Sequence, residues 1–139
     1  MLIIKYTVET TVAQDKIWQA LQDVENWHSW DHELEFSRID GPFKVGTKGQ
    51  LKPKGGPILE TLLTRVEPLK MFVQEAKLSL AKAVMSHFIT TVDGKTQVTF
   101  QTEIRGPLAL LYVCMLGRSI KKKIPLEMEE MLKKAKSLE

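Results

Sequence analysis

A change of hydrophobic period at Gly106-Pro107 constrains the fold of this chain more than any other feature of its sequence. Before it, short segments alternate apolar and polar side chains, which is the pattern of half-buried strands. After it, apolar side chains recur at every third or fourth position, which is the pattern of an amphipathic helix. A run of strands followed by one long helix predicts an α+β fold in which the helix covers a face of the sheet.

The C-terminal helix is expected to run from Leu108 to the end of the sequence. Its apolar stripe comprises Ile120, Ile124, Met128, Met131, Ala135 and Leu138. Pro107 suits the first helical position, because the N–H that proline lacks would be unpaired there. Pro125 removes the hydrogen bond to the carbonyl of Lys121, so we expect a kink near this residue.

The first hundred residues divide into strand-like and short helical segments. Residues 2–10 alternate as a strand, residues 14–24 have helical spacing, and residues 25–31 place two tryptophans among turn formers, as in a short helix or tight corner. Six more strand-like segments follow at 33–40, 46–52, 58–67, 71–79, 82–92 and 95–105. Asp93-Gly94 between the last two predicts a hairpin. This order predicts a curved seven-stranded antiparallel sheet wrapped around the long C-terminal helix, with two short helices between strands 1 and 2.

Length and composition exclude several classes of protein. The 139 residues suit a single domain over 1–139, and a chain with 43% hydrophobic and 27% charged residues is neither disordered nor a disulfide scaffold. The lone cysteine, Cys114, has no internal partner for a disulfide, which favours a reducing cytoplasm. The apolar start Leu2-Ile3-Ile4 ends at Lys5, so no secretion signal is expected. The longest apolar run, 108–116, is too short to span a bilayer, and we expect no integral membrane association.

The net charge of +3 comes from the C-terminal segment alone. Residues 118–139 hold seven of the 20 Lys/Arg and four of the 17 Asp/Glu, which leaves 13 of each in the rest of the chain. Nucleic-acid binding would favour aromatic residues among the basic ones, and none occur there. We expect a solvated helix face with Glu129–Lys133 and Glu130–Lys134 pairs, and no nucleic-acid partner.

Several short segments together resemble a known superfamily. They are Ala13-Gln14-Asp15-Lys16-Ile17-Trp18, residues 23–31 with their Trp-His-Ser-Trp-Asp ending, residues 65–70 (Arg-Val-Glu-Pro-Leu-Lys) and residues 93–99. In these the chain resembles the START/SRPBCC superfamily, which has the helix-grip fold of the birch-pollen allergen type, and in particular its polyketide cyclase/dehydrase-like branch. Ala13 and His32 depart from the pattern, because relatives often carry proline at both places.

The resemblance implies a cavity between the sheet and the long helix that holds a hydrophobic or amphipathic small molecule. The expected lining residues are Trp30, Phe72, Gln74, Phe88, Phe100, Thr102, Leu111 and Met115. Gln74 and Thr102 are in phase with apolar neighbours and would face inward. There they would hydrogen-bond a ligand, each other or trapped water.

Glu60 is the one candidate for acid–base chemistry on the expected inner face. If Ile58, Leu62 and Val66 face inward, the period of two places Glu60 inward as well. Leu59 and Leu63 compete for the same face, and a bulge would turn Glu60 outward. No second catalytic partner is identifiable from the sequence.

The histidines and the cysteine are assigned no chemistry. His87 has the opposite parity to Phe88, the better core residue, so we expect His87 outside. His28 and His32 are of a type that zinc accepts, but they match no zinc motif. Cys114 lacks an activating base and is expected to be buried by packing. We therefore expect no metal and no cofactor.

Three functions remain open. The first is non-enzymatic binding or transport of a lipid-like or polycyclic molecule by a monomer or weak homodimer. The second is a polyketide cyclase, aromatase or dehydratase in which Glu60 or a bound water moves protons. The third is a protein-interaction module that uses the C-terminal helix. The fold alone does not choose among them.

Overall fold

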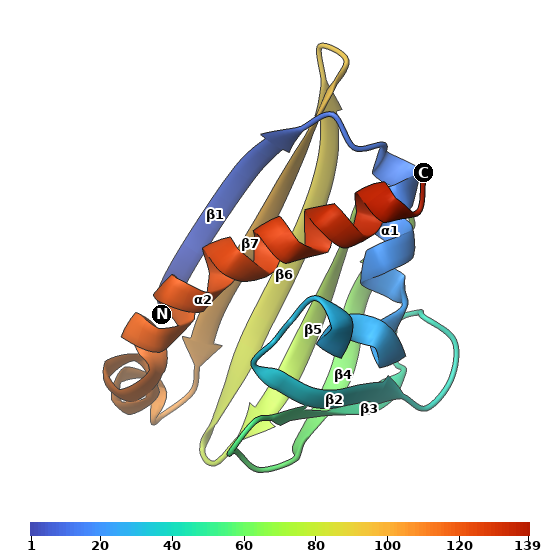
Figure 1. The fold of residues 1–139 in the computed structure, drawn as a ribbon. Helices are drawn as coiled ribbons and strands as arrows, with labels where there is room; N and C mark the ends of the chain where they lie inside the picture. The colour runs from blue at the N-terminus through green and yellow to red at the C-terminus, as the bar shows by residue number, and fades with distance from the viewer.

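The computed structural model describes residues 1–139 and shows a curved antiparallel sheet with one long helix against its concave side (Figure 1). Its elements are β1 (Leu2–Thr10), α1 (Gln14–Gln22), the 3-10 helix η1 (Val24–Ser29), β2 (Leu34–Ile39), β3 (Lys48–Pro53), β4 (Leu59–Glu67), β5 (Met71–Leu78), β6 (Ala81–Val92), β7 (Lys95–Arg105) and α2 (Ala109–Ser137). The seven strands follow the order β1-β7-β6-β5-β4-β3-β2, and every neighbouring pair is antiparallel. The predicted helix-grip architecture is confirmed.

The hairpin between β6 and β7 forms as its turn residues predict. Asp93 and Gly94 have φ values of 52° and 77°, the left-handed conformation that a two-residue hairpin turn of type I′ requires. Val92 pairs directly with Lys95 across the turn. These two strands make the longest ladder of the sheet and carry much of its concave face.

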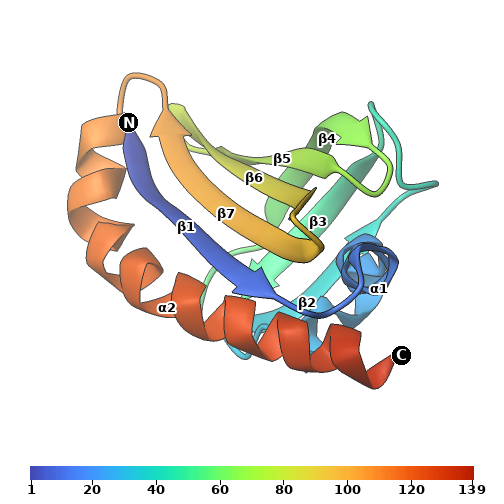
Figure 2. The ribbon, with the colours of Figure 1, turned by 90° about the horizontal axis from the view of Figure 1, so that it is seen from above.

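Helix α2 bends around the edge of the sheet, as Figure 2 shows from above. Its first turns run outside β1, and the remainder crosses the open side of the curve. The stripe predicted from the sequence is what it buries: Ile124 is 7% exposed, and Met128, Met131 and Ala135 are fully buried. Pro125 lies within the helix without ending it.

Aromatic side chains fill one end of the space between sheet and helices. Phe72, which is fully buried, lies 6.2 Å from the ring of Trp18, 6.1 Å from Trp27 and 5.0 Å from Phe43, measured between ring centroids. Edge-to-face and stacked rings at such distances stabilise a core beyond their buried area. Packing is therefore dense near α1, and space remains toward the β5–β6 hairpin.

The start of α2 differs from the prediction. The helix begins at Ala109 rather than Leu108, and Cys114, Leu111 and Met115 are exposed instead of buried. Here α2 lies at the edge of the sheet. Only the side that carries Ala109 packs, against Ile3 and Ile104, and the other side meets solvent.

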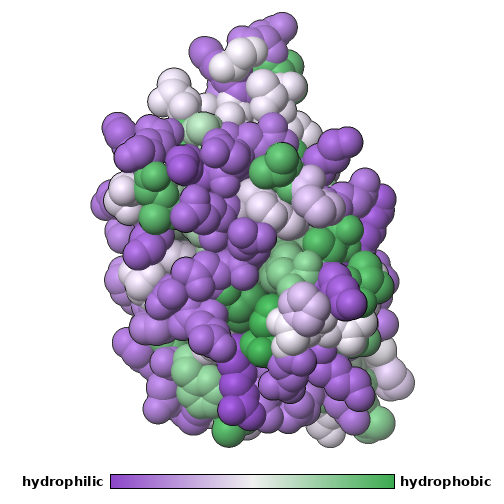
Figure 3. Space-filling view, turned by 90° about the vertical axis from the view of Figure 1, so that its right-hand side faces the viewer, coloured by the Kyte–Doolittle hydropathy of each residue, from purple (hydrophilic) through white to green (hydrophobic).

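One face of the molecule is largely polar (Figure 3). Figure 3 shows the right-hand side of Figure 1, where hydrophilic side chains surround a smaller hydrophobic area. No helix is both long enough and apolar enough to cross a lipid bilayer. Most apolar side chains of the strands instead face the enclosed space.

Candidate functional site

A cavity of about 400 Å³ lies between the concave face of the sheet and α2. Fourteen of its 25 lining residues are hydrophobic. The sheet contributes one wall, with Met85, Phe100 and Ile104 among its members, and α2 contributes the facing wall through Leu116, Ile120 and Ile124. Helix η1 and the residue that follows it close a third side with Trp27 and Trp30. This volume falls within the range of about 300–1,000 Å³ that is typical of small-molecule sites.

Two polar side chains predicted to face inward lie on the sheet wall. Gln74 is 2% exposed and Thr102 is 6% exposed, and both line the cavity. Each pairs with Met85 in the sheet, Gln74 from β5 and Thr102 from β7, so the two flank the same residue of β6. The predicted inward orientation of Gln74 and Thr102 is confirmed.

His87 faces the cavity, which corrects the prediction that it lies outside. The inward residues of β6 are those opposite Gln74, Phe72 and Ala76, namely Met85, His87 and Ala83. Ile89 shares this parity and is 1% exposed. Burying Ile89 therefore sets the register, and Phe88 is placed on the convex face.

The imidazole of His87 is held by two aromatic rings. It stacks on Phe72 at 4.2 Å between centroids with the planes 9° apart, and Phe100 meets it edge-on at 4.8 Å. Its Nδ1 atom is buried and has no hydrogen-bond partner. Burial lowers the pKa of His87 to about 3, although the nearby Phe72 backbone raises it somewhat. The ring is therefore neutral at physiological pH.

The facing wall carries a charged cluster made of Asp31, Lys123 and Glu127. The Lys123 Nζ atom lies 3.3 Å from Asp31 Oδ2 and 3.9 Å from Glu127 Oε2. Burial of the ammonium lowers the pKa of Lys123, but the neighbouring carboxylates of Glu127 and Asp31 outweigh it, and the net shift is upward. Lys123 is charged, and it is shared by two acids.

Glu127 is the more weakly paired of the two acids. Its side chain is 12% exposed, and burial raises its pKa to about 8, with the charge of Asp31 acting in the same direction and that of Lys123 opposing it. A carboxyl group with such a pKa is largely protonated at neutral pH. The cavity wall thus carries a group that can donate a proton or a hydrogen bond.

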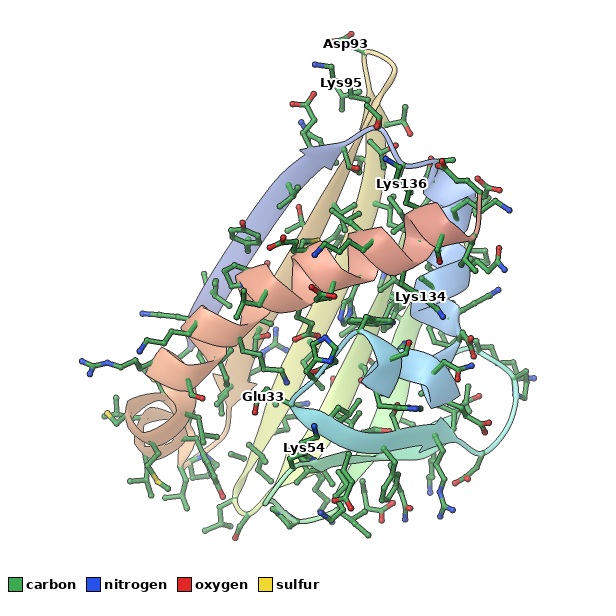
Figure 4. All side chains as sticks on the ribbon, viewed as in Figure 1. Glu33, Lys54, Asp93, Lys95, Lys134 and Lys136 are labelled. Carbon is green, nitrogen blue, oxygen red and sulfur yellow. The ribbon has the colours of Figure 1, made fainter.

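Glu33 and Lys54 mark the end of the cavity beside β2 and β3. They come from facing chain segments, where the Lys54 backbone N–H donates to the Glu33 carbonyl at 2.8 Å, and Figure 4 labels both below α2. Both residues line the cavity. The labelled Lys134 and Lys136 lie near the far end of α2, away from this position.

Four of the eight residues expected to line the cavity do so: Trp30, Gln74, Phe100 and Thr102. Phe72 lies behind the wall, where it supports His87. Phe88 is on the convex face, because it has the opposite parity to His87 and Ile89 in β6. Leu111 and Met115 are 51% and 65% exposed, because the first turns of α2 extend past the sheet.

The predicted inward orientation of Glu60 is wrong. A bulge between Leu63 and Arg65 lets Leu63 and Val66 both face inward, opposite Gln74 and Phe72, so the parity of Val66 does not extend back to Glu60. Glu60 is exposed and accepts a hydrogen bond from the Gln50 side chain at 3.1 Å.

Glu60 instead borders a more open depression of about 600 Å³ on the opposite face of the sheet. Charged side chains such as Glu75, Lys82 and Arg105 also line it, and only three of its 12 residues are hydrophobic. This composition does not suit an apolar ligand.

The remaining polar candidates lie on the surface. His28 is exposed, and His32 Nε2 lies 3.7 Å from Glu130 Oε2. The predicted Glu129–Lys133 pair forms at 3.7 Å, whereas Glu130 pairs with Lys133 at 3.2 Å rather than with Lys134.

Sequence reasoning missed Lys123 and Glu127, because both resemble ordinary members of a solvated face. One signal was present: Glu127 precedes Met128 of the buried stripe, and Lys123 precedes Ile124 in the same way. Residues adjacent to a stripe lie at the border of the buried face of a helix. Here this border of α2 faces the cavity, so the side chains of Lys123 and Glu127 are partly buried.

Comparisons with known proteins agree with this geometry. The model of the polyketide cyclase/dehydrase and lipid transport family matches residues 1–136. No curated protein sequence matches the chain.

Among solved structures, a hypothetical protein from Helicobacter pylori superimposes with a TM-score of 0.80 at 12% identity, covering 94% of this chain and 86% of its own. The aromatase/cyclase Zhui from Streptomyces sp. R1128 gives 0.71 at 14% identity, with 96% and 92% covered. Ara h 8.0201 gives 0.69 at 11% identity, with 96% and 97% covered. At such identities the likeness shows the fold.

Proposed function

Because this chain belongs to the polyketide cyclase/dehydrase and lipid transport family, we propose that it binds a hydrophobic or amphipathic small molecule in the cavity between its sheet and α2. The observation that carries the proposal is the cavity itself, which is largely apolar and bordered by a few polar groups. Apolar walls supply affinity, and isolated polar groups fix orientation. We propose that residues 1–139 act as one binding domain.

The walls suggest how a ligand would be held. Trp30, Met85 and Phe100 would contact its apolar body, since burying apolar surface stabilises by about 25 cal/mol per Å². The Gln74 amide and the Thr102 hydroxyl would meet an oxygen atom on the sheet side. A polycyclic or lipid-like molecule with one or two polar substituents has this character.

Binding of the neutral fluorescent probe N-phenyl-1-naphthylamine tests the proposal. Ala83 lines the cavity, so Ala83→Leu fills part of it, whereas Thr90→Leu changes an exposed residue on the same strand. We expect the probe to brighten with the wild type and with Thr90→Leu, and to bind at least about tenfold more weakly to Ala83→Leu. Equal affinity in all three proteins would contradict binding in this cavity.

A cyclase or dehydratase activity is the second candidate, and one observation favours it. The neutral imidazole of His87 and the carboxyl of Glu127 both line the cavity, where the carboxyl, with a pKa of about 8, can act as a general acid and the imidazole can accept a hydrogen bond. The enzyme reading predicts that His87→Phe or Glu127→Gln abolishes turnover of a bound polyketide while its dissociation constant changes little. Binding without turnover in the wild type would leave the carrier function.

A further inference from the structure

The cavity wall carries more acidic groups than basic ones. Three carboxyl groups line it, those of Asp31, Glu33 and Glu127, against two ammonium groups, those of Lys54 and Lys123. His87, the remaining titratable group on the wall, is neutral and adds no positive charge. With every acid ionised, the cavity would carry one negative charge in excess, and protonation of Glu127 removes it.

The contacts identify which acid lacks a partner. Both carboxylate oxygens of Asp31 have a partner. The Lys123 Nζ atom lies 3.3 Å from Oδ2, and the Glu33 backbone N–H donates to Oδ1 at 3.2 Å. Glu127 has only the same Lys123, at 3.9 Å, which is beyond hydrogen-bonding distance. Glu127 is therefore the buried acid whose anion is incompletely compensated.

Across the cavity, His87 offers a second unsatisfied group. Its Nδ1 has no partner in the protein, and buried polar atoms are normally hydrogen-bonded. An apolar ligand alone would leave the Glu127 carboxyl without a hydrogen-bond partner and the His87 nitrogen unpaired. A ligand with a positively charged donor group would satisfy the acid.

We propose that the cavity selects amphipathic molecules that carry a protonated amine, with the ammonium group seated against Glu127 and the apolar part between the sheet and α2. This proposal rests on the ligand-binding function and specifies its substrate class. A bound ammonium compensates the charge of ionised Glu127 and gives it a charge-assisted hydrogen bond. A bound carboxylate would place an uncompensated anion beside Asp31 and Glu127.

The proposal implies a pH dependence with a definite sign. Burial keeps Glu127 protonated in the empty cavity at neutral pH, since its pKa is raised to about 8. An ammonium favours the ionised form, so amine binding releases a proton and strengthens as pH rises from 6.5 to 8.5. The other groups facing the site are Asp31 and Glu33 from the segment before β2, Lys54 after β3, His87 of β6 and Lys123 of α2.

Calorimetric titration with octylamine, 1-octanol and octanoate tests this selectivity, because the three share one alkyl chain. At pH 8.5 we expect octylamine to bind about tenfold more tightly than 1-octanol, and octanoate to bind most weakly. At pH 6.5 the preference for the amine should shrink, while 1-octanol binds equally at both pH values.

Two variants separate the site from general charge. Glu127→Gln should bind 1-octanol like the wild type but lose the amine preference and its pH dependence. Glu129→Gln removes an exposed carboxylate, 63% accessible, from the same helix and should behave like the wild type. Octanol binding without amine preference, or a preference that survives Glu127→Gln, overturns this proposal alone. If none of the three probes binds, the ligand-binding function fails and this inference fails with it.

Discussion

Replacing His87 with phenylalanine should remove a large part of the acid sensitivity of this protein. The native ring lies between Phe72 and Phe100, where burial lowers its pKa to about 3, whereas an unfolded chain has the ordinary value near 6.5. Between about pH 3 and pH 6.5, His87 therefore binds a proton in the unfolded state but not in the native state. Stability from neutral His87 is complete above about pH 6.5 and is lost progressively as the pH falls toward 3.

The magnitude follows from the difference between the two pKa values. Each pH unit below the unfolded value costs about 1.4 kcal/mol, so at pH 4.5 the loss amounts to about 3 kcal/mol. Marginal stabilities of about 5–15 kcal/mol make this easily measurable. Phenylalanine keeps the aromatic stacking, has no titratable nitrogen and also removes the unpaired Nδ1.

Urea unfolding followed by tryptophan fluorescence, at pH values from 7.5 to 4.5, measures the effect. The wild type should lose about 3 kcal/mol more than His87→Phe over this range. Glu127 titrates in the opposite direction, but both proteins contain it, so its effect cancels in the difference. His28→Gln changes an exposed histidine and should follow the wild type. If His87→Phe loses stability with falling pH as steeply as the wild type, a buried neutral imidazole is not the cause.

Three further stability predictions follow from single positions. Burial holds Glu127 protonated while the unfolded chain ionises, so the contribution of Glu127 to stability should fall as the pH rises from 5 to 8, and Glu127→Gln should recover about 4 kcal/mol relative to the wild type at pH 8 in urea unfolding; an unchanged pH 8 stability would refute the raised pKa. Gly106 has φ of +117°, and an added Cβ would lie 2.8 Å from a backbone atom of β6, so Gly106→Ala should cost at least about 2 kcal/mol. Gly55→Ala, with open space around its Cβ, should cost less, and equal losses in melting temperature would contradict the steric argument. Met128 is fully buried, so Met128→Ala should lower the free energy of unfolding by about 2–5 kcal/mol. Leu126 is 65% exposed, so Leu126→Ala should lower it by less than about 0.5 kcal/mol. Similar losses for both variants would contradict the burial of the stripe.

The sequence predicted the elements well because each depends on local periodicity. The alternation of β7, the Asp93-Gly94 turn and the stripe of α2 are all properties of neighbouring residues, and all are found in the structure. The bend of the sheet around α2 also follows from the sequence, because consecutive antiparallel strands must together bury the single apolar stripe of one helix. Features that depend only on neighbouring residues were therefore predicted correctly.

The inner face was harder to predict, because it depends on register. One bulge in β4 moves Glu60 from the concave to the convex face, and the parity of β6 is decided by Ile89 rather than Phe88. The exposure of Leu111 depends on where the sheet ends relative to α2, and the periodicity of the sequence does not predict that position. The charged cluster needs three-dimensional proximity, since Asp31 and Lys123 are far apart in the sequence.

The three tryptophans allow the central claim to be tested in one titration. Trp27 and Trp30 line the cavity, whereas Trp18 packs against Phe43 and Phe72 behind it. In ¹H–¹⁵N NMR spectra, adding 1-octanol should shift the indole N–H signals of Trp27 and Trp30 and leave that of Trp18 nearly unchanged. Indole signals that stay in place at saturating octanol, or a shift confined to Trp18, would contradict ligand uptake between the sheet and α2.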